Sequence, residues 1–331
     1  MLTRVAPTAI AALLLLAACG GNDSAPKSVT QPNIRVMTFN TGTSTCEDSE
    51  FAEYTCDDAE LADRWYGNGL AFVAVMDDTR AFFDATRPDI VGFQEIFHPG
   101  NCPEIPPEFH TGFICEGWQP GDPTVAQYIL GPDYQIACHP GRPDKCLAVH
   151  TGFGRILGCD SAVCLDHLDA GVDQSCGGGT RIARGLIELS GGSRLTVVNI
   201  HGTSGRTQND QNCRVAQFDQ VFVDIRDGNG QPAVNGDRNI VLGDLNTDPG
   251  RRTAVDASAR RWNDFVGNGK AFYQISEVGQ QSEPTYANAF NIDHVASDAF
   301  VGNCFTGQPS EITAYDHMPI ICDLETDVNV K

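Results

Sequence analysis

The sequence has few basic residues and no hydrophobic run long enough to anchor it permanently. Its 331 residues include 22 lysines and arginines against 43 aspartates and glutamates, which gives a formal net charge of −21. Such a surface repels polyanions and disfavours tight, nonspecific nucleic-acid binding, although a bound cation or a few arginines would cancel charge locally. The apolar stretch from Ala9 to Ala18 is shorter than the roughly 20 residues of a transmembrane helix.

Several sequence motifs are also missing. No cysteine pair shows C-x-x-C spacing beside a matching C-x-x-C or H-x-x-x-H, so zinc sites are disfavoured. There is no Gly-rich loop of Walker type and no Gly-x-Ser-x-Gly sequence, which argues against a P-loop nucleotide site and a serine nucleophile. The 41% hydrophobic composition still suffices for a substantial core, so we expect one large globular domain or two ordinary ones.

The N-terminal segment resembles a bacterial lipoprotein signal peptide. Arg4 precedes the apolar stretch, which ends in small residues before Cys19. The resemblance implies that residues 1–18 are removed, that Cys19 is lipidated, and that residues 19–33 form a flexible tether. Gly20 after the cysteine resembles lipoproteins sorted to an outer membrane. We therefore expect an exported protein that is lipid-anchored to the bacterial cell envelope, or an extracellular one.

The cysteine count agrees with an oxidising compartment. The sequence has 13 cysteines. Without Cys19, which is expected to be lipidated, 12 remain, an even number suited to as many as six disulfides. Spacing does not fix the connectivity, but near neighbours are the most economical pairs because they close local loops. These pairs are Cys46 with Cys56, Cys102 with Cys115, Cys138 with Cys146, and Cys304 with Cys322.

Hydrophobic periodicity predicts alternating helices and strands. Helices are expected at Leu70 to Thr86 and Arg214 to Ile225, with loops at Asn40 to Ala59 and through most of Phe97 to Gly179. Strands that are apolar on both faces imply sheets covered by helices, and thus α/β layering around a two-sheet core. The expected strands are Ile34 to Phe39, Ile90 to Phe93, Tyr134 to Cys138, Leu147 to His150, Ile182 to Leu189, Leu195 to Ile200, Asn239 to Leu242, Asp293 to Ala296 and Pro319 to Leu324.

Six short segments each end or follow an apolar run with a carboxylate, an imidazole or an amide. A sheet presents ligands for a divalent metal at its rim in this way, so the segments indicate metal-assisted phosphoester hydrolysis. In chain order they are Thr38-Phe39-Asn40, Gly92-Phe93-Gln94-Glu95, Val198-Asn199-Ile200-His201, Gly243-Asp244-Leu245-Asn246, Asn291-Ile292-Asp293-His294 and Tyr315-Asp316-His317-Met318.

In this order and at these separations, the segments resemble the endonuclease/exonuclease/phosphatase superfamily, which includes deoxyribonuclease I, AP endonucleases, inositol polyphosphate 5-phosphatases and neutral sphingomyelinases. The resemblance covers roughly Ile34 to Leu324, so one such domain is expected at residues 34–331. It implies an α/β fold, a four-layer α/β sandwich with two packed, mainly antiparallel β-sheets covered by helices. This agrees with the layering expected from the periodicity.

The resemblance implies a divalent cation, Mg²⁺ or another such as Ca²⁺ or Mn²⁺. Glu95 corresponds to its main carboxylate ligand, and a hard cation prefers such oxygen donors. Asn40 would help to hold the metal, or its carboxylate ligand, and the scissile phosphate, and Asp316 would complete the metal side. Taken singly, a glutamate at a strand end is ordinarily solvated, and an asparagine near Gly42 is ordinarily a turn residue.

The same resemblance implies the catalytic roles. Asp244 would position or deprotonate the attacking water and Asn246 would bind the phosphate, since an extended backbone places both side chains on one side of the strand end. Asp293 would orient His317 and hold its imidazole in one tautomer. His201 would face the phosphate as a hydrogen-bond donor or as general acid to the leaving oxygen.

Two further positions stay open. Arg181 or Arg184 could supply a fixed cation as a phosphate contact, although a salt-bridged surface arginine is the ordinary interpretation. His294 stands where relatives usually carry an aromatic residue, so no role is assigned to it.

The leading hypothesis is a metal-dependent phosphodiesterase, a phosphoric ester hydrolase of nuclease or of sphingomyelinase and phospholipase C type. The segment from His201 to Phe218 resembles the histidine loop of bacterial sphingomyelinases, whereas deoxyribonuclease I is itself a secreted, acidic relative. The expected partners are a phosphodiester substrate, from nucleic acid or a phospholipid head group, and the membrane, with no protein partner implied. The alternatives are a catalytically inactive surface binding lipoprotein and an inositol phosphate phosphatase, which normally needs a basic pocket.

Overall fold

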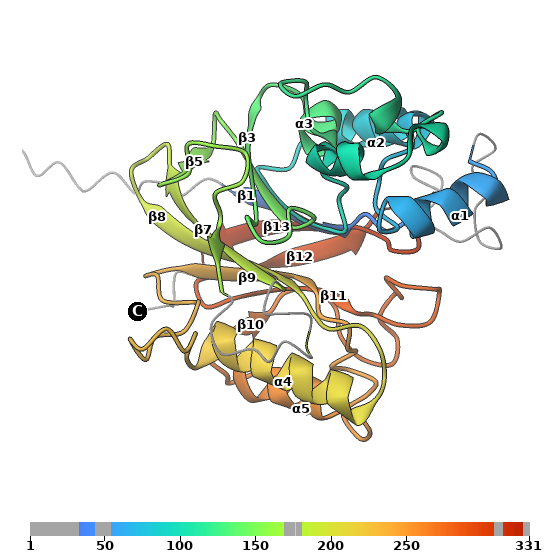
Figure 1. Ribbon diagram of the computed structural model, residues 1–331. Helices are drawn as coiled ribbons and strands as arrows, with labels where there is room; N and C mark the ends of the chain where they lie inside the picture. Colours follow the sequence, from blue (N-terminus) through green and yellow to red (C-terminus); the bar gives the residue numbers. More distant parts are fainter. Residues whose placement is uncertain (1–32, 44–53, 169–175, 177–180, 308–313, 327–331) are drawn as a thin grey trace, which may run out of the picture. The chain divides into compact units, whose positions relative to one another are not determined.

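The computed structural model of the chain describes residues 33–43, 54–168, 176, 181–307 and 314–326. The predicted signal peptide and the predicted tether up to residue 32, with Cys19, lie outside the described residues, as does Cys46. All described residues belong to one compact unit, residues 32–331. Their strands form one sheet of six strands and one of seven (Figure 1).

The first sheet has its only parallel pair at its centre. Its strand order is β12-β13-β1-β2-β4-β3, in which β1 and β2 are parallel and all other neighbours are antiparallel. The strands are β1 (Ile34–Asn40), β2 (Ile90–Gln94), β3 (Tyr134–Cys138), β4 (Cys146–His150), β12 (Phe300–Thr306) and β13 (Ile320–Thr326).

The second sheet follows the same plan. Its order is β10-β11-β9-β8-β7-β5, with β6 also beside β7, and β8 and β9 are its one parallel pair. The strands are β5 (Gly154–Ile156), β6 (Asp166–His167), β7 (Ile182–Leu189), β8 (Arg194–His201), β9 (Asn239–Asp244), β10 (Tyr273–Gln274) and β11 (Asp293–Ser297). The prediction of two mainly antiparallel sheets is confirmed.

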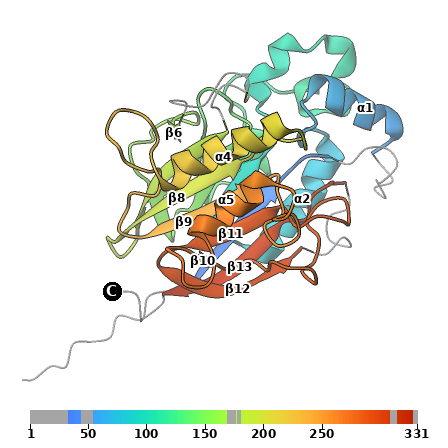
Figure 2. The ribbon, with the colours of Figure 1, turned by 90° about the horizontal axis from the view of Figure 1, so that it is seen from below.

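Helices cover the outer faces of both sheets, which gives the predicted four layers (Figures 1 and 2). α2 (Val73–Thr86) and α3 (Val125–Leu130) lie over the first sheet, and α4 (Gln208–Phe222) and α5 (Ala257–Phe265) lie over the second. The other helices of the described ranges are α1 (Cys56–Trp65) and three 3₁₀ turns, Pro99–Glu104, Pro107–Phe109 and Ile114–Glu116. None of the helices found in these ranges has the length and apolar character needed to cross a membrane.

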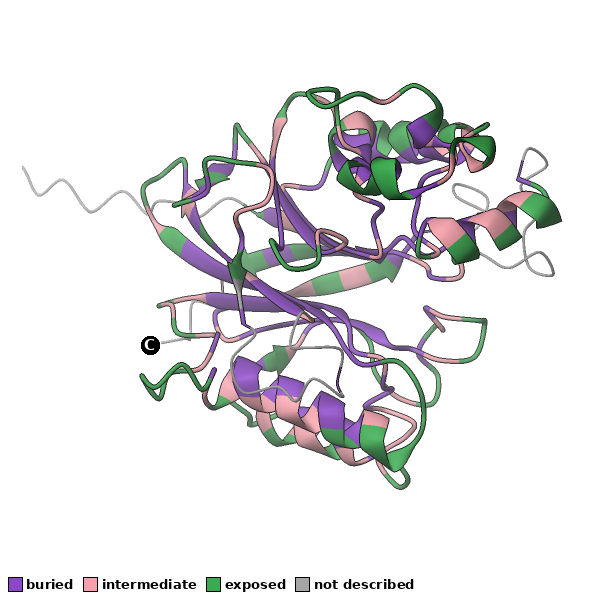
Figure 3. Ribbon diagram, in the orientation of Figure 1, coloured by how far each residue is buried: buried purple, intermediate pink, exposed green. Residues whose placement is uncertain are grey.

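Alternation along the strands divides the core into three apolar layers. In β1, Met37 and Phe39 pack on the helix side of the first sheet, whereas Val36 packs between the sheets. In β9, Val241 faces the covering helices and Leu242 faces the other sheet. The sheets are therefore buried on both faces, while the helices keep an exposed face (Figure 3). Strands buried on both faces are mainly apolar, with few polar residues such as Thr38, Thr196 and Asn199, and this is why most of them were predicted.

The helices differ more from the prediction than the strands do. The helix expected at Arg214 begins at Gln208, because the Thr207 hydroxyl accepts from the backbone N–H of Asp210 in a capping box. α1 begins at Cys56, inside a predicted loop, behind a similar capping box. α2 begins three residues after the predicted start. α3, α5 and β12 were not predicted.

Five disulfides join described cysteines. Three predicted pairs are confirmed: Cys102–Cys115, Cys138–Cys146 and Cys304–Cys322. The other two, Cys159–Cys164 and Cys176–Cys213, were not predicted. Two of the five join residues that lie directly opposite each other on neighbouring antiparallel strands, β3 with β4 and β12 with β13.

Candidate active site

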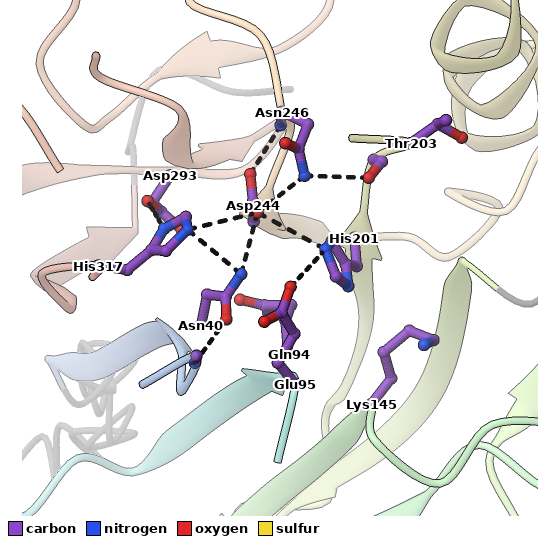
Figure 4. Close-up of polar contacts among 12 residues, drawn as sticks. Asn40, Gln94, Glu95, Lys145, His201, Thr203, Asp244, Asn246, Asp293 and His317 are labelled. Carbon is purple, nitrogen blue, oxygen red and sulfur yellow. Dashed lines mark hydrogen bonds and ion pairs between the residues drawn. The ribbon is translucent and has the colours of Figure 1, made fainter. Parts of the chain in front are cut away.

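The predicted functional side chains lie where the parallel strands of both sheets end. β1 and β2 end in register at Asn40 and Gln94, and β8 and β9 end in register at His201 and Asp244. Antiparallel β11 begins at Asp293, opposite Asp244. The strand ends thus bring together polar groups from distant parts of the chain (Figure 4).

Two buried amides join the sheets beneath the site. Gln94 Nε2 donates to Asn199 Oδ1 at 2.6 Å, and Asn199 Nδ2 donates to the Phe93 carbonyl at 2.8 Å. Gly92 permits the close approach, because a Cβ there would lie 2.1 Å from Leu242 Cδ1. The sequence analysis included both amides in its segments but gave them no role. Their position fixes the spacing of the strands that carry the site.

Three side-chain oxygens converge beside Gly42. A Cβ on Gly42 would lie 2.7 Å from Glu95 Oε2, 2.9 Å from Asp316 Oδ1 and 3.3 Å from Asn40 Oδ1. Asp316 Oδ1 is buried and has no hydrogen-bond partner. Two carboxylates and an amide form the donor set that a hard divalent cation prefers. The three residues expected to hold the metal therefore lie together and fit such an ion.

The two carboxylates of this set have opposite pKa shifts. Burial raises the pKa of Asp316 to about 7, and the charges of Glu95, Asp244 and other carboxylates add to this while His317 opposes it. Burial also acts to raise the pKa of Glu95, but the hydrogen bond and charge of His201 and the charge of His317 lower it to about 2. A cation bound between them would relieve the repulsion between these carboxylates.

His317 is held by a buried carboxylate. Its Nδ1 donates to Asp293 Oδ2 at 2.8 Å, and its Nε2 lies 3.4 Å from Asn40 Nδ2 and 3.9 Å from Asp244 Oδ2. Burial acts to lower the pKa of His317, but the charge and hydrogen bond of Asp293 raise it to about 10. The ring is therefore an imidazolium at neutral pH, fixed in orientation, with Tyr286 packed 4.6 Å from its centroid.

Asp244 is surrounded by amide donors. Its Oδ1 accepts from the Asn246 backbone N–H at 2.7 Å, and its Oδ2 accepts from Asn246 Nδ2 at 2.9 Å and Asn40 Nδ2 at 3.0 Å. Asn246 has φ 52°, so the prediction that an extended backbone aligns the two side chains is wrong, and a turn aligns them instead. Glu95 also has a positive φ, of 57°. Burial raises the pKa of Asp244.

His201 connects the two halves of the cluster. Its Nε2 lies 3.2 Å from Glu95 Oε1 and 3.7 Å from Asp244 Oδ2 (Figure 4). Its Nδ1 is buried and has no hydrogen-bond partner. The imidazole thus lies between the carboxylates of Glu95 and Asp244.

A second set of potential metal ligands lies nearby. Ligand atoms of Asp244, Asp293 and His317 lie within 4.8 Å of one another. In this set His317 Nδ1 is already bonded to Asp293, and both oxygens of Asp244 accept from amides. The oxygens beside Gly42 therefore suit a divalent cation better.

Two residues that the sequence analysis left without a settled role, Arg181 and His294, lie outside this cluster of contacts. Arg181 precedes β7 and its carbonyl accepts from the His201 backbone N–H at 2.8 Å. Burial lowers the pKa of its guanidinium, and its Nε has no hydrogen-bond partner. His294 is buried, with Nε2 2.9 Å from the Asn291 carbonyl and Nδ1 3.0 Å from Ser276 Oγ, so it is part of the packed interior.

A cavity of about 270 Å³ opens beside the cluster. Its lining includes residues that the sequence analysis did not identify. No local pattern marks them, because separate loops bring them together. They are Arg206, Arg252, Tyr286 and Phe290. The role of Gly42 was missed as well, although it lies two residues after Asn40.

Comparisons with known proteins give the fold. No family model and no curated protein sequence matches the chain. It is similar to the human Nocturnin catalytic domain solved with a bound sulfate anion, with TM-score 0.52, 14% identity, and 90% of this chain and 96% of that chain covered. It is similar to D. rerio TDP2 complexed with a single-strand DNA product, with TM-score 0.51, 13% identity and coverage of 89% and 100%.

A third similar structure is ANGEL2, described as a 2′,3′-cyclic phosphatase, with TM-score 0.50, 11% identity and coverage of 88% and 95%. The chain therefore has the fold of the endonuclease/exonuclease/phosphatase superfamily, and the resemblance seen in the sequence is confirmed at the level of the fold.

Proposed function

We propose that this protein is a divalent-metal-dependent phosphoester hydrolase that cleaves a phosphodiester with an activated water. The strongest support is the cluster of oxygens from Asn40, Glu95 and Asp316 that converge beside Gly42. Similar structures described with a sulfate anion, a DNA product or a cyclic phosphatase activity also support a phosphate ester as substrate.

The side chains fit defined roles in this reaction. A divalent cation held by Asn40, Glu95 and Asp316 would supply positive charge for the phosphoryl oxygens. The imidazolium of His317 is fixed by Asp293. Its Nε2–H would bind a phosphoryl oxygen beside the cation that Asn40, Glu95 and Asp316 would hold. These fixed charges favour a substrate whose negative charge grows in the transition state.

The water and the leaving group are assigned to the other half of the cluster. Asp244 is held by amide donors and its pKa is raised by burial, so it suits the positioning or deprotonation of a water. Asn246 would bind the phosphate only by giving up a present contact, because both N–H groups of its side-chain amide already donate, to Asp244 Oδ2 at 2.9 Å and to the Gly202 carbonyl at 3.1 Å. His201, whose Nε2 lies 3.2 Å from Glu95 Oε1, would protonate the leaving oxygen. No covalent intermediate is needed.

The substrate type is the open part of the proposal. A nuclease and a phospholipase C of sphingomyelinase type are the two main forms, and an inactive binding protein of this fold or an inositol phosphate phosphatase are the alternatives. The test uses plasmid DNA, bis(4-nitrophenyl) phosphate, sphingomyelin and inositol phosphates, each with Mg²⁺, Mn²⁺ or Ca²⁺ and with EDTA. Metal-dependent cleavage in this panel supports the proposal, and cleavage of nothing favours a binding protein.

Variants test the site itself. Glu95→Gln and His317→Ala should each lower kcat about 10²–10⁴-fold, the range expected for loss of a group that stabilises charge or transfers a proton. Arg194→Gln is the control, because Arg194 is exposed and begins β8 at the end opposite to His201. Circular dichroism spectra should match the wild type. Undiminished turnover in either site variant would refute the assignment.

We also propose that the protein is exported and anchored through a lipid on Cys19. Five disulfides among the described residues suit an oxidising compartment. In a bacterial host, Cys19→Ala should move the protein from the detergent-extracted membrane fraction to the soluble fraction. An unchanged distribution would contradict lipid anchoring.

A further inference from the structure

Two arginines lie together in the cavity that adjoins the catalytic cluster. The guanidinium carbons of Arg206 and Arg252 lie 4.9 Å and 5.9 Å from the centroid of the Phe290 ring. All three residues line the same cavity of about 270 Å³ as Glu95 and His317. The cavity therefore leads from the proposed catalytic centre to a pair of guanidinium groups.

Carboxylates compensate the positive charges of these two guanidinium groups less than they compensate the charges of several other arginines. Among the described residues, Arg206 makes no ion pair. The nearest carboxylate to Arg252 is Asp256, at 3.9 Å, and that carboxylate is already 3.0 Å from Arg214 and accepts from Thr247. In contrast, several arginines of this acidic chain pair with a carboxylate within 3.1 Å, namely Arg35, Arg155, Arg184 and Arg261.

The backbone that carries both arginines is fixed by buried contacts. Buried Arg214 donates to the Thr203 carbonyl at 2.6 Å and the Gly205 carbonyl at 2.9 Å, which holds the loop before Arg206. The Arg252 backbone N–H donates to the Asp248 carbonyl at 3.0 Å. The backbone at both arginines is therefore fixed before any ligand binds, and the Phe290 ring is what the two guanidinium groups contact.

The aromatic residue beside them does not suit a cationic ligand. An aromatic ring binds a quaternary ammonium through its electron-rich faces. Phe290 already interacts with two guanidinium groups, so a choline group placed there would meet two like charges. An anion at the same place would meet two donors suited to phosphate.

We infer that Arg206 and Arg252 form an anion subsite that binds a second phosphate group of the substrate, next to the phosphate that is hydrolysed. The inference rests on the proposed function. The second phosphate belongs either to a neighbouring nucleotide or to a phosphorylated head group, and both offer the same chemistry to the arginines. A zwitterionic phosphocholine head group lacks this phosphate.

Matched substrates test the subsite. Thymidine 5′-(4-nitrophenyl phosphate) is compared with the same compound carrying a 3′-phosphate, and glycerophosphoinositol with glycerophosphoinositol 4-phosphate. 4-Nitrophenyl phosphorylcholine is the cationic probe. The wild type should prefer the bisphosphorylated member of at least one pair by about tenfold in kcat/KM, as expected for hydrogen bonds to a charged group. The pair that shows the preference identifies the source of the phosphate.

The variants decide the outcome. Arg206→Gln and Arg252→Gln should each reduce this preference at least about threefold, the double variant should abolish it, and Arg194→Gln should leave it unchanged. Three outcomes would overturn the inferred subsite. The double variant could show the same preference as the wild type, the wild type could show no preference, or the wild type could cleave the choline ester preferentially. Lack of metal-dependent hydrolysis of any probe would instead refute the proposed function.

Discussion

Among single residues, Asp316 has a buried carboxylate that destabilises the fold when it is charged, and the same carboxylate is a proposed metal ligand. Its pKa is raised from 3.8 to about 7, first by burial and then by neighbouring carboxylates. An acid whose pKa is raised on folding contributes stability below its unfolded pKa, and this contribution is lost as the pH rises towards the folded pKa. In the absence of a cation, Asp316 should therefore destabilise the protein above pH 7 and have little effect near pH 4.

We predict that Asp316→Asn raises the midpoint of thermal unfolding at pH 8 in EDTA by about 3 °C or more and leaves it nearly unchanged at pH 4. The amide removes the buried negative charge and keeps the shape of the side chain. The same variant should lose the stabilisation that Mg²⁺ or Mn²⁺ gives to the wild type. Asp323→Asn is the control, because that carboxylate is half exposed and paired with Arg35. No gain at pH 8 would contradict the prediction.

Gly42 leaves room where a cation would bind. A Cβ at this position would lie 2.7 Å and 2.9 Å from two carboxylate oxygens, closer than real Cβ contacts, so Glu95 and Asp316 would have to separate. We predict that Gly42→Ala raises the metal concentration for half-maximal activation at least about tenfold, a loss of roughly 1.4 kcal/mol in binding. Calorimetric titration with Mn²⁺ gives a readout that does not depend on turnover.

Gly191→Ala is the matched control for this substitution. A Cβ on Gly191 would have nothing within 4 Å, and its backbone is not left-handed. Metal binding should therefore stay at the wild-type level. If Gly42→Ala bound Mn²⁺ as tightly as this control, the cation would have to bind elsewhere.

Among the elements, α4, α5 and the loop after β8 meet at one buried arginine. Arg214 in α4 is 1% exposed and pairs with Asp256, the N-cap of α5, at 3.0 Å. Its Nε donates to Ser258 at 2.8 Å, and its remaining donors hold the loop carbonyls of Thr203 and Gly205. Two helices that cover the outer face of the second sheet thus fix the loop that borders the cavity (Figures 1 and 2).

We predict that Arg214→Gln lowers the free energy of unfolding by about 3–5 kcal/mol, because it removes the close charge partner of buried Asp256 and leaves only Arg252, at 3.9 Å. Arg155→Gln removes a similar ion pair, with Glu188, but its side chain is 69% exposed, so the loss should stay within about 1 kcal/mol. Urea unfolding followed by circular dichroism measures both. Equal losses in the two variants would show that Arg214 is not the structural centre described here.

Two of the elements that the sequence did not predict, α5 and β12, have weak hydrophobic patterns. α5 buries Trp262 as its single large apolar side chain, beside Ser258 and Ala259, and it carries two arginines. β12 is an edge strand with mixed burial and contains a glycine and an asparagine. By contrast, strands that lie between two packed layers are mainly apolar, and most of them were found from the sequence alone.

For the whole molecule, the net charge of −21 sets the long-range field. We predict that kcat/KM for single-stranded DNA rises as ionic strength increases from about 0.01 to 0.1 M, because the Debye length falls from about 30 to 10 Å and screens the repulsion. Initial rates at fixed metal concentration measure this, with bis(4-nitrophenyl) phosphate as the weakly charged control. A steady fall with salt, as for proteins that bind DNA by neutralising phosphates, would contradict it.

The sequence by itself determined the local structure and the chemistry that is present. The strand periodicity, three disulfides and the residue types of the six segments are properties of near neighbours along the chain. The tertiary structure decided which of these groups meet. Asn40 and Asp244 are 204 residues apart and share a 3.0 Å hydrogen bond because two sheets pack with their parallel strand ends together. The oxygens that converge beside Gly42 and the arginine pair at Phe290 depend on the same packing, which no local pattern encodes.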